Sequence, residues 1–255
     1  MILTDTHTHL YYERDPEKRN SLMQRCLESQ VSRIFLPNVD SDSIGMVTEL
    51  VSEYPDNCFA MLGLHPCDVK EGYKSELEII EKAISQTKIY AIGEIGIDLY
   101  WDKSTLAIQQ EAFRLQIAWA KELNLPIVIH CRDAFDEVYE VLLSQKDKTL
   151  RGIFHCFTGT KEQADKVIDL GFYLGIGGVV TYKNSGLDNV LEQLDLKNIV
   201  LETDSPYLTP VPFRGKPNES SYLTYIAQKV ADVKRVSIDE VAAITTENSK
   251  NIFGV

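Results

Sequence analysis

The chain has 255 residues, of which 44% are hydrophobic and 25% are charged, and its net charge is −12 at pH 7. These values are typical of a soluble globular protein with one large domain or two small ones. The negative charge argues against a broad basic surface for duplex nucleic acid, although bound cations would add local positive charge. No apolar stretch approaches the ~18 residues of a membrane span, and the N-terminus lacks signal-peptide features. We therefore expect no membrane association.

Segments typical of strands and helices alternate along the whole chain. The pattern predicts eight short, nearly all-apolar strands at Ile2–Asp5, Arg33–Pro37, Phe59–Gly63, Tyr90–Gly93, Ile127–His130, Gly152–His155, Phe172–Ile176 and Ile199–Thr203. The predicted helices are Pro16–Gln30, Ser43–Tyr54, Ser75–Ser85, Ser104–Asn124, Ala134–Ser144, Lys161–Leu170, Gly186–Leu194, a helix near Tyr222–Lys234 and two short helices after it. Strands that are apolar on both faces indicate a parallel sheet covered by helices. Eight strand–helix units predict one domain over residues 1–255, an α/β fold of the (β/α)8 TIM-barrel type, with its active site at the C-terminal ends of the strands.

All five histidines stand at or just past the end of a predicted strand. His7 and His9 are two residues apart, so in extended backbone they point to the same side and can bind one metal ion. His130 and His155 end the fifth and sixth strands, which are neighbours in a barrel, and each can give one nitrogen to a second metal. His65 ends the third strand, where it binds substrate, aids proton transfer or serves the structure; we place substrate binding first.

Two carboxylates complete the predicted cluster. Glu94 follows the fourth strand, and its two oxygens allow it to bridge two cations. Asp204 ends the eighth strand, which abuts the first on closure, so it binds metal, takes a proton from the attacking water, or does both. Asp98 either orients a ligand or caps a turn. Glu202 shares the direction of Asp204 deeper in the barrel, as a supporting group or a structural ion pair.

Other residues near these strand ends are candidates for substrate contacts. Arg132 directly follows His130-Cys131, where its guanidinium holds a phosphate or forms an ion pair at the rim. Arg214 lies in the Pro- and Gly-containing segment Ser205–Ser220, which is either a substrate loop or a plain connector. The five cysteines are odd in number and show no CxxC spacing, which favours reduced thiols in the cytoplasm. By strand alternation, Cys131 and Cys156 should face the helices.

These motifs together resemble the TatD family of metal-dependent deoxyribonucleases, a branch of the amidohydrolase-like barrels. The resemblance covers essentially the whole chain and rests on motifs in the same order and spacing: Asp5-Thr-His-Thr-His-Leu10, Gly63-Leu-His-Pro66, Gly93-Glu-Ile-Gly-Ile-Asp98, Leu125-Pro-Ile-Val-Ile-His-Cys-Arg-Asp-Ala134, Phe154-His-Cys-Phe-Thr-Gly159, Leu201-Glu-Thr-Asp-Ser-Pro-Tyr-Leu208 and Pro210-Val-Pro-Phe-Arg-Gly-Lys216. By position, the resemblance implies one divalent metal held by His7, His9, Glu94 and Asp204, and a second held by Glu94, His130 and His155.

The resemblance implies an enzyme that hydrolyses phosphodiester bonds of DNA, as a 3′-5′ exonuclease that prefers single strands. Two divalent ions, magnesium, manganese or zinc, would activate the water, with Glu94 and Asp204 as the catalytic carboxylates. Hydrolysis of small amides, esters, lactones or aminoacyl-tRNA at the same metals is the alternative, because one barrel hosts many chemistries. A non-catalytic metal-binding scaffold is a third possibility, but the full ligand set argues against it. We expect a monomer without an obligate protein partner.

Overall fold

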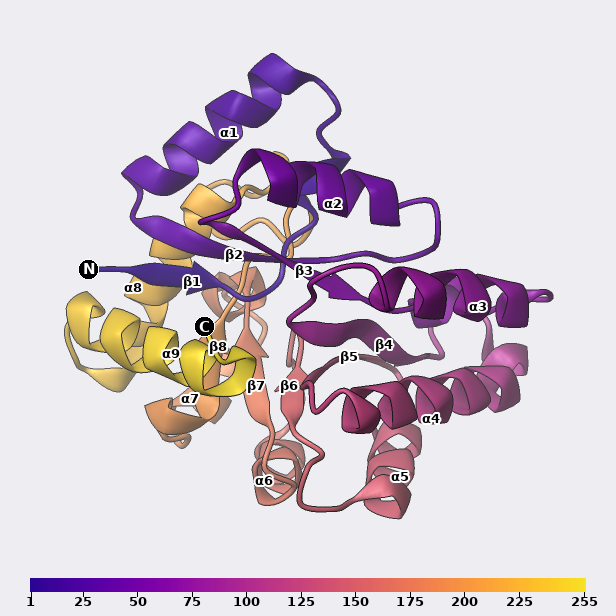
Figure 1. The fold of residues 1–255 in the computed structure, drawn as a ribbon. Helices are drawn as coiled ribbons and strands as arrows, with labels where there is room; N and C mark the ends of the chain where they lie inside the picture. The colour runs from indigo at the N-terminus through magenta and orange to yellow at the C-terminus, as the bar shows by residue number, and fades with distance from the viewer.

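The strands form a barrel in which every strand pairs with the next one in the chain. The computed structural model describes residues 1–255 and contains one parallel sheet in the order β1 to β8 (Figure 1). The strands are β1 (Leu3–Asp5), β2 (Val31–Pro37), β3 (Cys58–Leu62), β4 (Ala91–Asp98), β5 (Ile127–Arg132), β6 (Gly152–Phe154), β7 (Tyr173–Ile176) and β8 (Ile199–Leu201). The predicted (β/α)8 barrel is confirmed.

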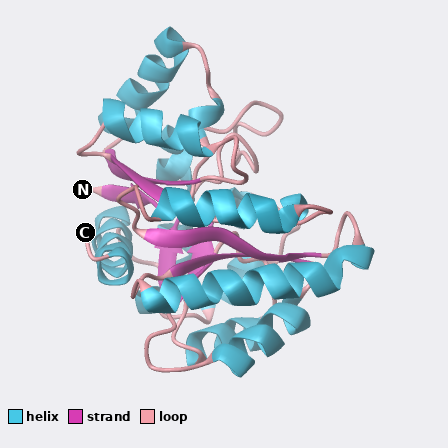
Figure 2. Cartoon of the chain, turned by 45° about the vertical axis from the view of Figure 1, so that its right-hand side comes forward, coloured by secondary structure: helices cyan, strands magenta, loops and turns pink.

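Helices surround the strands on the outside of the barrel, as Figures 1 and 2 show. They are α1 (Pro16–Glu28), α2 (Ile44–Glu53), α3 (Tyr73–Ile84), α4 (Leu106–Glu122), α5 (Phe135–Gln145), α6 (Lys161–Asp169), α7 (Leu187–Glu192), α8 (Leu223–Lys234) and α9 (Ile238–Phe253). Short 3-10 helices occupy Leu10–Tyr12, Pro66–Asp68, Lys103–Thr105, Gly178–Thr181, Leu196–Asn198 and Ser220–Tyr222. No helix is both long and apolar enough to cross a membrane.

The end of the chain differs from the prediction. Instead of two short helices after residue 234, the structure has the single 16-residue helix α9. Ser237 begins it, because its hydroxyl accepts the Glu240 backbone N–H at 3.1 Å, and Gly254 ends it in the left-handed region. No glycine or proline interrupts the segment, and its buried side chains pack on β1 and β8.

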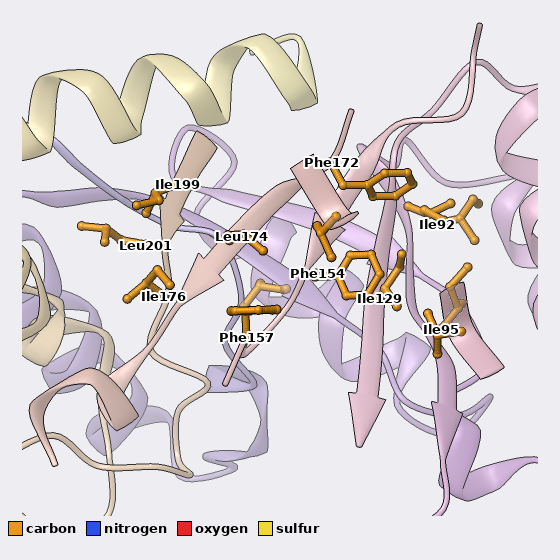
Figure 3. Close-up of a cluster of buried hydrophobic side chains, with 14 of the residues drawn as sticks. Ile92, Ile95, Ile129, Phe154, Phe157, Phe172, Leu174, Ile176, Ile199 and Leu201 are labelled. Atoms are coloured by element: carbon orange, nitrogen blue, oxygen red, sulfur yellow. The ribbon is translucent and has the colours of Figure 1, made fainter. Parts of the chain in front are cut away.

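Alternation along β5 explains how the fold directs side chains into the site. Ile127 and Ile129 belong to the large cluster between sheet and helices, part of which Figure 3 draws. Val128 belongs to a second cluster inside the base of the barrel, with Phe35 among its members. Because His130 has the direction of Val128, it points into the barrel interior at the strand's carboxyl end.

The barrel closes where the segments after β1 and β8 meet. The backbone N–H and the hydroxyl of Thr6 both donate to the Leu201 carbonyl, each at 3.0 Å. The Asp5 carboxylate accepts the Thr203 N–H at 2.9 Å and the Thr203 hydroxyl at 2.6 Å. These side-chain bonds fix the first and last strands side by side, so residues from both ends of the chain share one site.

Candidate metal centre

The structure brings all five histidines together with Glu94 and Asp204 at the carboxyl ends of the strands. On one side, Glu94 Oε2 lies 3.1 Å from His7 Nε2 and 3.8 Å from His9 Nε2. Asp204 Oδ1 lies 3.6 Å from His9 Nε2 and 3.9 Å from His7 Nε2. Two imidazoles and two carboxylates therefore face one point, which is the four-residue set predicted for the first metal.

The other oxygen of Glu94 faces a different group of histidines. Glu94 Oε1 lies 2.8 Å from His130 Nδ1 and 3.5 Å from His155 Nε2. His65 Nε2 is 3.4 Å from the same oxygen and 3.3 Å from His130 Nδ1. His65, predicted as a substrate contact, thus lies within the cluster of candidate metal ligands. This position suits a metal ligand as well as a substrate contact. The two oxygens of one carboxylate point to two separate sets of nitrogen donors, as a bridging ligand requires.

The burial of these groups fits a metal ion better than a network of neutral hydrogen bonds. Glu94 and His7 are buried, and neither ring nitrogen of His7 has a hydrogen-bond partner. Burial alone would raise the pKa of Glu94, but the surrounding histidines hold it well below its usual value. Burial and the neighbouring His155 lower the pKa of His7. An ionised carboxylate beside the unpartnered, neutral imidazole of His7 is a suitable donor pair for a divalent cation.

A local irregularity in β4 makes the position of Glu94 possible. Strict alternation from Ile92, which faces the helices, would send Glu94 outward as well. The pairing with β5 shifts register between Ile92 and Ile95, and Glu94 faces the interior instead. Gly93 permits the close approach of the two strands, because a Cβ there would lie 2.7 Å from the Cβ of Val128.

Most of the metal-facing histidines are oriented by a partner at the opposite ring nitrogen. His9 Nδ1 is 2.8 Å from the Tyr11 hydroxyl, which donates to the Pro37 carbonyl at 2.7 Å. His130 Nε2 lies 2.8 Å from Asp98 Oδ2. Sequence reasoning missed Tyr11, although its position two residues after His9 was the available signal. Such partners fix the ring and the tautomer of a metal-binding histidine.

Glu202 is the corresponding partner of His155. It is fully buried, and its Oε1 lies 3.0 Å from His155 Nδ1 while it also accepts the Cys156 N–H. Burial alone would lower the pKa of His155, but Glu202, with the other nearby carboxylates, raises it to about 10. The close approach requires Gly175, where a Cβ would lie 2.3 Å from Glu202 Oε2. The supporting role considered for Glu202 therefore has a geometric basis.

A cavity of about 700 Å³ opens above these groups. It is lined by members of both sets, except His7, and by rim residues that include Trp101, Arg132, Tyr207 and Leu208. Tyr207 and Leu208 belong to the segment 205–220, which is thus part of the cavity wall rather than a remote connector.

Cys156 also lines the cavity. The expectation that it faces the helices is wrong, because the strand has ended and Cys156 has a left-handed φ of 47°.

The two predicted arginines lie at different places on the rim. Arg132 lines the cavity and forms no ion pair; its guanidinium carbon lies 3.7 Å from the centroid of the Tyr100 ring. Arg214 stacks on Tyr182 at 3.9 Å and lines a separate groove. Val179 lines both the groove and the main cavity. The groove that Arg214 lines therefore adjoins the main cavity at Val179.

The chain resembles known proteins along almost its whole length. The family model described as "TatD related DNase" matches residues 4–254. The uncharacterized metal-dependent hydrolase YabD of Bacillus subtilis is 41% identical over 255 residues, which is 100% of each chain. The 3′-5′ ssDNA/RNA exonuclease TatD of Yersinia pseudotuberculosis is 33% identical over 240 residues, with 92% of each chain covered. The crystal structure of YjjV, a TatD homologue of Escherichia coli, superposes with a TM-score of 0.93 at 28% identity and covers 99% of this chain and 98% of that one.

Proposed function

This chain belongs to the family of TatD-related DNases, and on that premise we propose that its metal-dependent hydrolase activity cleaves phosphodiester bonds of DNA. We further propose 3′-5′ exonuclease action on single strands, the activity named for the Yersinia relative. The observation that carries the proposal is the position of Glu94, whose two oxygens face two separate sets of histidines. Two cations held by these two sets would form the arrangement that many phosphodiesterases use.

We propose two divalent cations, one held by His7, His9, Glu94 and Asp204 and the other by Glu94, His130 and His155. The donor atoms that lie closest together form the groups His7–His9–Glu94 and His65–Glu94–His130, so His65 is a further candidate ligand of the second cation. When bound, these ions would supply a nucleophilic water at neutral pH and neutralise charge on the phosphate. Mixed nitrogen and oxygen donors suit zinc or manganese, and the carboxylates also suit magnesium. The identity of the ions stays a prediction.

The chain's own side chains contribute proton transfer and positioning. Burial alone would raise the pKa of Asp204, but His9, together with His155 and His7, lowers it, so this carboxylate is ionised at neutral pH. Asp204 can therefore accept the proton of the attacking water. Arg132 has no carboxylate partner, so its guanidinium is free to hold a phosphate oxygen of the substrate. The cytoplasmic location and the monomeric state also stay predictions.

Hydrolysis of small amides, esters, lactones or aminoacyl-tRNA is the second candidate. Two observations favour it: the net charge of −12, and a cavity of about 700 Å³, a size common among small-molecule sites. The free guanidinium of Arg132 at the cavity favours a phosphate-containing substrate instead. The two candidate functions therefore differ in whether Arg132 at the rim should bind a phosphate group of the substrate.

The test is cleavage of a 5′-labelled single-stranded DNA oligonucleotide by metal-stripped protein, with magnesium, manganese or zinc added back. Glu94→Ala should abolish cleavage, and Glu78→Ala, an exposed glutamate on α3, is the matched control. A ladder that shortens from the 3′ end would support exonuclease action, whereas internal cuts would indicate an endonuclease. If the protein binds two metals and cleaves no DNA with any ion, the deoxyribonuclease proposal fails, and ester and amide substrates should then be tested.

A further inference from the structure

Two aromatic side chains stand exposed at the edge of the metal-binding cavity. Tyr100 and Trp101 lie two and three residues after the end of β4, and they are 51% and 72% exposed. Their rings meet edge to face, with centroids 4.8 Å apart. Exposed apolar residues are common on protein surfaces, so exposure alone does not make a binding site. The position of this pair relative to the cavity is what distinguishes it.

Trp101 lines the same cavity as the metal-facing side chains, and so does Arg132. The guanidinium carbon of Arg132 lies 3.7 Å from the Tyr100 ring centroid and 5.7 Å from that of Trp101. Because Arg132 forms no ion pair, its charge is held by aromatic faces and stays available to a ligand. A flat aromatic surface beside a free guanidinium matches a ligand that is itself flat at one end and anionic at the other. A nucleotide has this combination.

The loop that carries the aromatic pair is fixed to the metal centre. Asp98 accepts the Tyr100 N–H at 3.0 Å, and the same carboxylate lies 2.8 Å from His130 Nε2. The Leu99 N–H donates to the Arg132 carbonyl at 3.0 Å. One buried carboxylate thus joins a metal-facing histidine to the backbone of the rim. A group bound on Trp101 would be held in a defined position relative to the metal ligands.

We propose that Trp101, supported by Tyr100 and Arg132, forms a subsite on which a nucleobase of the substrate stacks. This inference rests on the proposed nuclease function and specifies how that site takes single strands. In a duplex, neighbouring base pairs cover both faces of a base, so only an unstacked base can lie on the indole. Every base has such a face, so the subsite favours unpaired ends with little sequence preference.

The first experiment combines changes in the protein with changes in the DNA. Trp101→Ala and Trp101→Phe are compared with Leu143→Ala, which removes an exposed apolar side chain from α5 outside the cavity. Each metal-loaded protein cleaves single-stranded oligonucleotides of one sequence in which a single base near the 3′ end is removed, one position at a time. The values of KM and kcat are measured separately.

We expect Trp101→Ala to raise KM about 5- to 150-fold, the range of a base–aromatic stack, while Trp101→Phe retains most of the affinity. Removing the stacked base should raise KM by a similar factor in the wild type and have no further effect in Trp101→Ala. If Trp101→Ala behaves like Leu143→Ala while the wild type cleaves DNA, the stacking subsite is refuted and the nuclease proposal stands. If the wild type cleaves no nucleic acid with any ion, both proposals fall.

Fluorescence gives an independent readout, because the chain has only two tryptophans and Trp119 is buried in α4. In a Trp119→Phe protein, excited where tyrosine does not absorb, the emission comes from Trp101 alone. An oligonucleotide with 3′-terminal phosphorothioate linkages should quench it, and its counterpart without bases should not. Equal quenching by both oligonucleotides would show that the backbone, and not a base, contacts the indole, which would overturn the proposal.

Discussion

Glu202→Gln isolates the effect of one buried charge on the metal centre. The substitution keeps the size of the side chain, and the amide oxygen can still accept the Cys156 N–H. It removes the negative charge that lies 3.0 Å from His155 Nδ1. A carboxylate at this nitrogen keeps the ring oriented and makes the opposite nitrogen a stronger donor. The variant should therefore fold normally and bind the metal at His155 more weakly.

The expected loss is 10- to 100-fold in metal affinity, about 1.4 to 2.7 kcal/mol, as for other supporting partners of ligand histidines. The lower end would apply if the amide oxygen turned toward Nδ1 and replaced the carboxylate as acceptor. The first metal should be less affected, because Glu202 contacts none of His7, His9 and Glu94. We therefore expect the metal affinity of one site to fall and that of the other site to stay nearly unchanged.

The assay is a competition titration of the metal-stripped protein with zinc or manganese against a chelator of known affinity. Glu122→Gln, an exposed glutamate at the end of α4, is the matched control. Circular dichroism of both variants checks that the fold is intact. If the folded Glu202→Gln protein binds two metals as tightly as the control, then Glu202 is only a structural group, and the argument from ligand orientation is wrong.

Three further outcomes follow from buried contacts. Gly175→Ala should lower metal affinity, because the added Cβ would lie 2.3 Å from Glu202 Oε2. Gly177→Ala is the control, since its Cβ would lie 3.7 Å from the nearest Glu202 atom, and it should not change the affinity. Equal metal affinities of the two variants would contradict this reasoning. Phe35→Ala, in the stacked aromatic cluster at the barrel base, should lower the free energy of unfolding by about 3 to 5 kcal/mol in guanidinium titrations, and a loss below about 1 kcal/mol would count against that packing. His155 has its pKa raised from 6.5 to about 10 in the metal-free protein, so its charge stabilises that state fully below pH 6.5, and this stabilisation is lost as the pH rises toward 10. Thermal unfolding of metal-free protein should show a weaker decline over this range in His155→Asn than in the wild type.

The barrel, and the positions at which most of the candidate metal ligands come together, could be predicted because both depend on patterns that are local in the sequence. Short all-apolar strands indicate a covered parallel sheet, and a polar side chain at each strand end predicts where the site lies. His7, His9 and Asp204 meet in the structure because barrel closure joins the first strand to the last. The α9 helix was misjudged because polar residues interrupt its apolar pattern, while tertiary packing holds it as one piece.

Details that depend on irregular backbone could not be predicted. Glu94 faces inward through a register shift that simple alternation does not anticipate. Cys156 enters the cavity because the backbone turns after a strand of only three residues. Tyr11, the partner of His9, was not predicted although it lies only two residues away, whereas Asp98 was expected either to orient a ligand or to cap a turn and contacts both His130 and the Tyr100 N–H. The fold can thus be predicted from the periodicity of the sequence, whereas the directions of the individual side chains in the site cannot.

The closure of the barrel has a consequence for how the Asp-Thr-His-Thr-His motif should be interpreted in related chains. Asp5 and Thr6 hold β8 through their side chains, and His7 and His9 face the metal position. Different residues of one pentapeptide therefore serve the architecture and the chemistry of the protein. A descendant that lost catalysis would still be constrained at the first two positions. Related chains that have lost activity should therefore carry substitutions at the two histidines and at Glu94, while Asp5 and Thr6 stay unchanged.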